Sequence, residues 1–266
     1  MQTSSPETPQ LRVTHTGTRV STAEHLLVRN ALERLLGLRL ELGEFYQLAA
    51  RDSRLKPLVK RFCGVKPPRF PTIFEALVNA IACQQMSLSL GILLLSRLTQ
   101  KFGLAAQGTS APDHAFPRPE DVVGLKPEAF RKLGFSRQKG RALIALAQEF
   151  CVRPREWETL EDLDNQAAVE RLLELRGIGR WSAEYALLRG LGRLNVYPGD
   201  DVGARNNLKR WLGVRRTLDY EGVRQITARW QPFAGLVYFH LLLARLADAG
   251  HVFARNEEST SLRGSR

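Results

Sequence analysis

The chain has 266 residues, enough for one large domain or two small ones, and its 44% hydrophobic content excludes an intrinsically disordered protein. A formal net charge of +12 favours a polyanionic partner, either nucleic acid or an anionic membrane surface. No apolar run approaches the roughly 18 to 20 residues that span a bilayer and no signal segment follows Met1, so we expect a cytoplasmic protein without a membrane partner, nucleoid-associated if bacterial.

Helical spacing of apolar residues dominates the chain between two polar ends. Residues 1–20 and 254–266 are polar and without period, and we expect both to be mobile tails. Alternation typical of a strand occurs only weakly, within residues 11–20. Beyond residue 20 the apolar residues recur at helical spacing, in stretches such as NALERLLGL and GRALIALAQEF. The sequence therefore predicts a many-helix bundle, with no repeated unit typical of a solenoid.

Capping signals place several helix boundaries. Thr72 and Glu75 have the spacing of a capping box at the start of one helix. Ser87 is expected to cap the next helix, which ends at Gly103 before a linker rich in helix breakers. Two further helices are expected to meet near Gly134.

The cysteines and histidines lack the spacing of a disulfide framework or a metal centre. We expect the three cysteines to be buried and reduced, since none forms a Cys-x-x-Cys pair: Cys63, Cys83 and Cys151. His240, within LVYFHLLL, is expected to be a packing residue of the core. We therefore predict no cofactor and no metal ligand among these residues.

The stretch LRGIGRWSAEYALL, residues 175–188, contains a Gly-x-Gly turn with three interpretations. A dinucleotide-binding loop is disfavoured, because a helical pattern precedes Gly177 and Ser182 stands at the third glycine position. A plain turn between packed helices is the ordinary use of such a pattern. The third interpretation is a helix-hairpin-helix: Leu175 packs between the helices, Gly177 and Gly179 allow the hairpin backbone, and exposed amides face a DNA phosphate.

Acidic and basic residues flank this stretch. Asp200 and Asp201 follow in YPGDDVGARNNL, where capping a helix is the commonest use of an aspartate. The densest basic run, FRKLGFSRQKGR, contains Arg137 and Lys139. We predict that these two contact DNA phosphates, with a solvated helix face as an equally supported interpretation.

Three segments, in this order, resemble a known family. EALVNAIACQQMSLSLG, LRGIGRWSAEYALLRG and NVYPGDDVGARNNL are similar to the motifs of the helix-hairpin-helix, glycine/proline-rich, aspartate (HhH-GPD) superfamily of DNA glycosylases. Within it the chain is most similar to the AlkA-type 3-methyladenine DNA glycosylases. Trp181 stands where bifunctional members carry a lysine that forms a Schiff base, so no lyase step is expected. Three scattered cysteines do not supply the four-cysteine cluster of the iron–sulfur branch.

The resemblance implies roles for individual residues. Asp201 matches the catalytic aspartate, which stabilises an oxocarbenium-like sugar and orients water. Trp181 and Tyr185 are expected to stack on a cationic flipped base, although an ordinary core pair has the same helical spacing. Gln85 or Met86 is expected to fill the gap that the base leaves. The predicted DNA contacts also include the hairpin and the break between two helices: Gly177, Ile178, Gly179, Arg180, Gln84, Gln85 and Met86.

We predict an all-α, two-lobed HhH-GPD fold. Residues 21–70 are expected to pack with residues 200–253 as one lobe, and residues 71–199, with the hairpin, to form the other. The N-terminal β domain of AlkA-type enzymes is predicted to be reduced or absent. Leu242 stands where some members carry a tryptophan on the last long helix, which predicts a wider pocket.

The predicted function is that of a monofunctional glycosylase that removes 3-methyladenine or 7-methylguanine type bases from double-stranded DNA. We expect it to act as a monomer and without a cofactor; the family leaves open a structural monovalent cation at the hairpin. Two alternatives remain at this point. One is a helix-hairpin-helix DNA-binding module without catalysis, and the other is a glycosylase for another lesion, such as hypoxanthine.

Overall fold

The computed structural model describes residues 3–4, 10–14, 21–105 and 114–252. Within these ranges the prediction of an all-α fold is confirmed, because helices form nearly all of the regular structure. The exception is a two-stranded antiparallel pair, β1 (Thr3–Ser4) with β2 (Gln10–Leu11). Most of the two segments predicted to be mobile tails lies outside the described residues.

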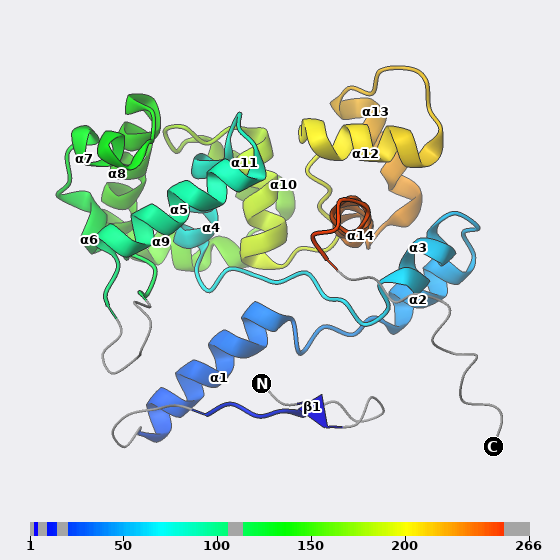
Figure 1. Cartoon of the computed structure of the whole chain (residues 1–266), viewed down its shortest axis with the longest axis horizontal. Coiled ribbons are helices and arrows are strands. Elements are labelled where there is room, and N and C mark those ends of the chain that lie inside the picture. The colour runs from blue at the N-terminus through cyan, green and yellow to red at the C-terminus, as the bar shows by residue number, and fades with distance from the viewer. Residues whose placement is uncertain (1–2, 5–9, 15–20, 106–113, 253–266) are drawn as a thin grey trace.

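Figure 1 shows how the helices are arranged in space. Short 3-10 segments η1 (Thr159–Asp162) and η3 (Ala228–Trp230) and the π-helical segment η2 (Leu187–Leu191) extend some of them. The α-helices of the described ranges are α1 (Thr22–Leu36), α2 (Gly43–Ala50), α3 (Leu55–Arg61), α4 (Ile73–Cys83), α5 (Leu88–Phe102), α6 (Pro119–Val123), α7 (Pro127–Leu133), α8 (Arg137–Val152), α9 (Pro154–Glu158), α10 (Asn165–Leu173), α11 (Arg180–Ala186), α12 (Val202–Leu212), α13 (Tyr220–Thr227) and α14 (Ala234–Asp248).

Two hydrophobic cores hold these helices together. The first lies among α4, α5, α8, α10 and α11, and the second lies among α2, α3, α12 and α14. Each large apolar side chain that folding buries contributes roughly 1.5–3 kcal/mol. Leu187 packs in the first core and its neighbour Leu188 packs in the second, so the end of α11 lies where the two cores meet.

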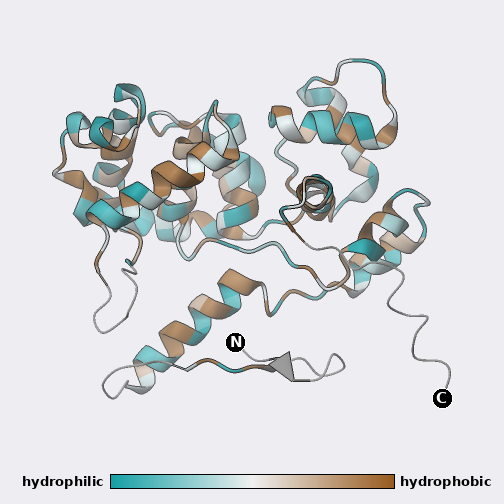
Figure 2. Cartoon of the chain, viewed as in Figure 1, coloured by the Kyte–Doolittle hydropathy of each residue, from teal (hydrophilic) through white to brown (hydrophobic). Residues whose placement is uncertain are grey.

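Helix α1 belongs to neither core. It has no buried residue, and Figure 2 shows hydrophobic and hydrophilic residues along its length. Its C-terminal end is held by Arg34, which donates to the carbonyl oxygen of Gly190 at 2.7 Å and to that of Phe70 at 3.3 Å. Within residues 21–70, therefore, α2 and α3 pack with the C-terminal helices, whereas α1 does not.

Most predicted caps are present, and one is only half formed. Ser87 caps α5, which ends at Gly103 as predicted. The Thr72 hydroxyl accepts the backbone N–H of Glu75 at 3.1 Å, but the Glu75 carboxylate makes no return bond among the described residues. The prediction of a full capping box there is wrong. A complete box forms instead between Ser21 and Glu24, at the start of α1.

The outcome for the cysteines and for His240 differs. Cys63 is exposed, so the prediction that all three cysteines are buried is wrong, while Cys83 and Cys151 are half-buried. His240 is a buried core residue as predicted, with Nδ1 2.8 Å from the carbonyl oxygen of Leu236. Burial lowers the pKa of this imidazole.

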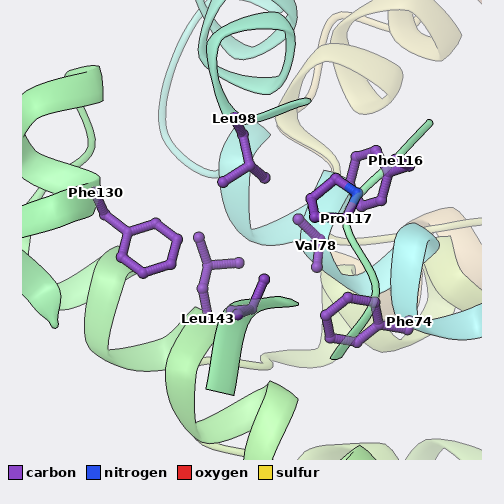
Figure 3. Close-up of a pocket in the computed structure, with 8 residues that line it drawn as sticks. Phe74, Val78, Leu98, Phe116, Pro117, Phe130 and Leu143 are labelled. Carbon is purple, nitrogen blue, oxygen red and sulfur yellow. The ribbon is translucent and has the colours of Figure 1, made fainter. Parts of the chain in front are cut away.

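A small pocket between α4, α5, α7 and α8 belongs to the first core. Figure 3 shows its labelled side chains converging, and every residue that lines it is apolar. Because such a lining supplies no group for acid, base or nucleophilic chemistry, the pocket is part of the core packing.

Candidate DNA-binding and catalytic site

The Gly-x-Gly stretch forms a tight hairpin between α10 and α11. Leu175 and Ile178 are buried and tie the hairpin to the first core. Gly177 has φ +85°, and a Cβ there would lie 2.7 Å from Cβ of Ala142 on α8. Both the backbone and the close approach therefore require glycine at this position.

Gly179 has a different reason to be glycine. Its φ of −103° is ordinary, so of the two glycines predicted to allow the hairpin backbone only Gly177 has a positive φ. It stands at the N-cap of α11 without a side-chain cap, and a Cβ there would meet nothing within 4 Å. Gly179 thus lies on an open surface where another molecule can approach the backbone.

The turn between α4 and α5 is fastened to this hairpin. The Gln84 amide donates to the carbonyl oxygen of Gly177 at 2.8 Å and to the buried hydroxyl of Ser182 at 2.9 Å. From the other side, the Lys139 ammonium donates to the carbonyl oxygens of Ala82 and Gln84 at 2.9 and 2.7 Å. Burial lowers the pKa of Lys139. Lys139 therefore holds the end of α4, a role that its basic run did not predict.

Gln85 is the exposed tip of this turn. It has φ +54°, the only positive φ of a non-glycine residue in the described part of the chain. Such a conformation is uncommon outside glycine and persists where the surrounding structure imposes it. Met86, in contrast, is half-buried and packs against the first core. Of the two residues predicted to fill the gap left by the base, Gln85 is the exposed one.

Trp181 and Tyr185 form a stacked pair on α11. Their ring centroids are 5.5 Å apart at an interplanar angle of 29°, and both side chains are half-buried. The Tyr185 hydroxyl donates to Oδ1 of Asn79, on α4, at 2.9 Å. Burial raises the pKa of Tyr185 to about 12, so its hydroxyl stays protonated near neutral pH.

Asp201 caps a helix, as its sequence context suggested, and also contacts the aromatic pair. It is the N-cap of α12, with Oδ1 accepting the backbone N–H of Ala204 at 2.8 Å. Its other oxygen, Oδ2, accepts the indole N–H of Trp181 at 3.1 Å and the hydroxyl of Tyr238 at 2.9 Å. The helix start thus places one oxygen of the carboxylate at the edge of the aromatic pair.

Tyr238, on α14, was not predicted. It is buried, its ring meets Tyr197 edge to face at 5.3 Å, and burial together with the Asp201 charge raises its pKa well above the ordinary value. Leu242, one turn later on the same helix, is half-buried. The last long helix therefore contributes a phenol to the Asp201 carboxylate.

Glu184 is a second residue that sequence reasoning missed. It is buried on α11, where Oε2 accepts the backbone N–H of Gly199 at 3.0 Å and Oε1 accepts the hydroxyl of Tyr220 at 2.6 Å. Burial raises the pKa of its carboxyl group. Glu184 therefore anchors the loop that ends at Asp201. A carboxylate between the two aromatic positions of α11 was the only sequence signal.

Arg180 and Arg137 are exposed, whereas Asp200 is half-buried. The Asp200 carboxylate is 3.5 Å from the Arg205 guanidinium and 3.8 Å from that of Arg180. Arg180 also lies over the Tyr220 ring, 4.4 Å from its centroid. Arg137 is exposed and paired with Glu128 at 3.1 Å. Arg180 lies next to the hairpin, whereas Arg137 lies at the start of α8.

Among the described residues no group of three or more His, Cys, Asp or Glu side chains could hold a metal ion. A monovalent cation held by hairpin carbonyls would share the Gly177 oxygen with Gln84. No helix in the described ranges is long and apolar enough to cross a membrane.

These features are typical of a helical DNA-processing domain of the helix-hairpin-helix class. They are a hairpin with open backbone amides, a projecting turn beside it and a carboxylate at the edge of stacked aromatics. The chain belongs to the family described as HhH-GPD superfamily base excision DNA repair protein, whose model matches residues 78–232.

Known relatives and structures agree with this assignment. The chain is 26% identical over 201 residues to a DNA-3-methyladenine glycosylase of Bacillus subtilis, covering 76% of this chain and 66% of that protein, just under two thirds of its length. It is 30% identical to DNA-3-methyladenine glycosylase 1 of Schizosaccharomyces pombe, over 61% of this chain and 69% of that protein. Its fold is similar to that of the 3-methyladenine DNA glycosylase from Archaeoglobus fulgidus, with a TM-score of 0.76 and 30% identity over 85% of this chain and 76% of the other.

A structure with DNA is also similar. The S. pombe 3-methyladenine DNA glycosylase in complex with abasic DNA matches with a TM-score of 0.63 and 27% identity, covering 73% of this chain and 92% of that one.

Proposed function

We propose that this protein is a monofunctional DNA glycosylase that removes alkylated bases from double-stranded DNA. The observation that carries the proposal is the position of Asp201, whose Oδ2 lies 3.1 Å from Trp181 Nε1 at the edge of the Trp181–Tyr185 pair. A carboxylate beside a stacking surface suits a reaction in which a flat cationic base leaves and positive charge develops on the sugar. A protein that only binds DNA has no use for that arrangement.

Hydrogen bonds join the elements that we propose to contact DNA. The hairpin at Gly179 offers open backbone for a phosphate, and Gln84 ties it to the turn that carries Gln85. We propose that Gln85 enters the duplex and fills the space of the flipped nucleotide. The net charge of +12 supplies the salt-dependent part of the affinity.

The chemistry follows from the leaving group. A base alkylated at a ring nitrogen is already cationic, so it leaves without a general acid. The Asp201 carboxylate stabilises the oxocarbenium-like sugar and takes up the proton of the attacking water. Trp181 stands at the position after Gly-Ile-Gly-Arg, and its indole cannot form a Schiff base with the sugar, so we propose hydrolysis without strand cleavage. The proposed reaction uses one protein molecule and no cofactor.

The test is release of free bases from duplex DNA treated with a methylating agent, with Asp201→Asn under identical salt. We expect wild type to release 7-methylguanine and 3-methyladenine and to leave the strand intact until alkali is added. No release by wild type, together with equal binding of damaged and undamaged duplex, would favour the non-catalytic DNA-binding module. Release from hypoxanthine-containing duplex but not from methylated DNA would assign the other lesion class.

A further inference from the structure

A side-chain amide, that of Asn79, contacts the ring of the aromatic pair that Asp201 does not bond. Asp201 contacts the pair through the indole N–H of Trp181, whereas Asn79 contacts it through the hydroxyl of Tyr185. Asn79 is half-buried on α4. It stands five residues before Gln84, which bonds the hairpin. The two polar groups thus contact different rings of the stacked pair.

The orientation of the Asn79 amide is fixed by its neighbours. Its Oδ1 accepts the Tyr185 hydroxyl at 2.9 Å and the Cys83 thiol at 3.9 Å. In this arrangement the oxygen faces both neighbours and the NH₂ group faces away from them. Nδ2 has no acceptor among the described residues. The amide therefore offers two free donors and no free acceptor.

A base on this surface would present its far edge to those donors. If the sugar lies beside Asp201, which bonds Trp181, the far part of a base held by the aromatic pair has Tyr185 and its partner Asn79 as its polar neighbours. For a purine that edge carries the substituent on C6. We infer that Asn79 Nδ2 donates a hydrogen bond to the flipped base and selects 6-oxopurines, an inference that rests on the proposed glycosylase function.

The selection follows from what each base offers at that edge. The carbonyl oxygen of 7-methylguanine accepts a hydrogen bond, so it pairs with the amide donor. The amino group of 3-methyladenine is a donor, and two donors facing each other leave both unpaired. A site built to hydrogen-bond one group discriminates against a ligand that leaves the site's polar group unpaired.

Methylated duplex DNA contains both bases, so one reaction measures both rates. The variant is Asn79→Leu, which is similar in size and neither donates nor accepts a hydrogen bond. A carboxylate is unsuitable here, because it would accept from the amino group of 3-methyladenine and repel the oxygen of 7-methylguanine. We expect the ratio of 7-methylguanine to 3-methyladenine release under single-turnover conditions to fall about tenfold relative to wild type, the worth of one hydrogen bond.

Tyr185→Phe provides a second variant that keeps the aromatic ring. It removes the hydroxyl that orients the amide, so the same ratio should fall in the same direction and by a smaller factor. Equal slowing of both bases, or an unchanged ratio in both variants, would refute the role of Asn79 while leaving the glycosylase function in place. Absence of any base release by wild type would instead remove the proposed function, and this inference with it.

Discussion

Replacing Asp201 by asparagine separates the catalytic role of this residue from its structural one. The carboxylate accepts three hydrogen bonds, from the N–H of Ala204, the indole of Trp181 and the hydroxyl of Tyr238. Asparagine has the same size and is as good an N-cap as aspartate, so the Ala204 bond and the start of α12 are retained. At the position of Oδ2, however, an NH₂ group faces two donors, and the negative charge is gone.

The two effects differ in size. Removal of one preorganised group that stabilises transition-state charge costs about 100- to 1000-fold in rate. Loss of the indole bond costs about 1–2 kcal/mol of folding free energy, since the Tyr238 hydroxyl can rotate and accept from the new amide. For a chain of this size, that lowers Tm by about 2–8 °C. Base release should therefore collapse while the protein stays folded at 25 °C.

The assay is single-turnover release of 7-methylguanine, followed by chromatography, with Tm measured by circular dichroism on the same samples. The matched control is Asp200→Asn, because Asp200 is the adjacent acidic residue and its partly exposed carboxylate pairs with Arg205 at 3.5 Å. We expect the control to lie within about twofold of wild type, since a long ion pair between two partly exposed side chains contributes little. Release by Asp201→Asn within tenfold of wild type would refute the catalytic assignment.

Further predictions concern the hairpin, the loop anchor and a buried carboxyl. Gly177→Ala places a Cβ 2.7 Å from that of Ala142 at a positive φ and should cost about 1–3 kcal/mol of stability. Gly179→Ala should keep Tm within about 2 °C and weaken DNA binding. Thermal unfolding measures the stability of both variants and fluorescence anisotropy with duplex DNA measures their binding; equal Tm losses would contradict the hairpin argument. Glu184→Ala leaves the Gly199 N–H without its acceptor, so base release should fall more than DNA affinity does, and parallel losses would mean that Glu184 serves stability alone. Burial raises the pKa of Glu75 from 4.5 to about 7, so the folded protein holds this proton more tightly than the unfolded chain, and stability falls as pH rises through that window. Glu75→Gln should therefore raise Tm relative to wild type at about pH 8 and leave Tm nearly unchanged near pH 4. A Tm difference that does not depend on pH would refute the argument.

Local sequence signals predicted the helix boundaries well. They could not predict contacts between residues far apart in the chain. Ser87 and Gly103 bound α5 because a cap depends only on residues within one turn. A motif assigned Asp201 and Trp181 to one site, although 20 residues separate them, and the hydrogen bond between them came only from the structure. Tyr238 reaches Asp201 from 37 positions away, and its helix looked like an ordinary apolar core segment. The motif gave each residue's expected role, and the packing of α4, α11 and α14 determined which side chains meet.

The same packing explains the position of Lys139. A lysine in a basic run is expected to face solvent, yet the C-terminal end of α4 presents the carbonyl oxygens of Ala82 and Gln84, which need donors as the helix stops. Those carbonyls lie against α8, and Lys139 is the cation that reaches them. The charge therefore stabilises the turn that holds Gln85 at φ +54°. Lys139, which the sequence assigned to a DNA phosphate, here bonds the backbone next to Gln85, the residue proposed to enter the duplex.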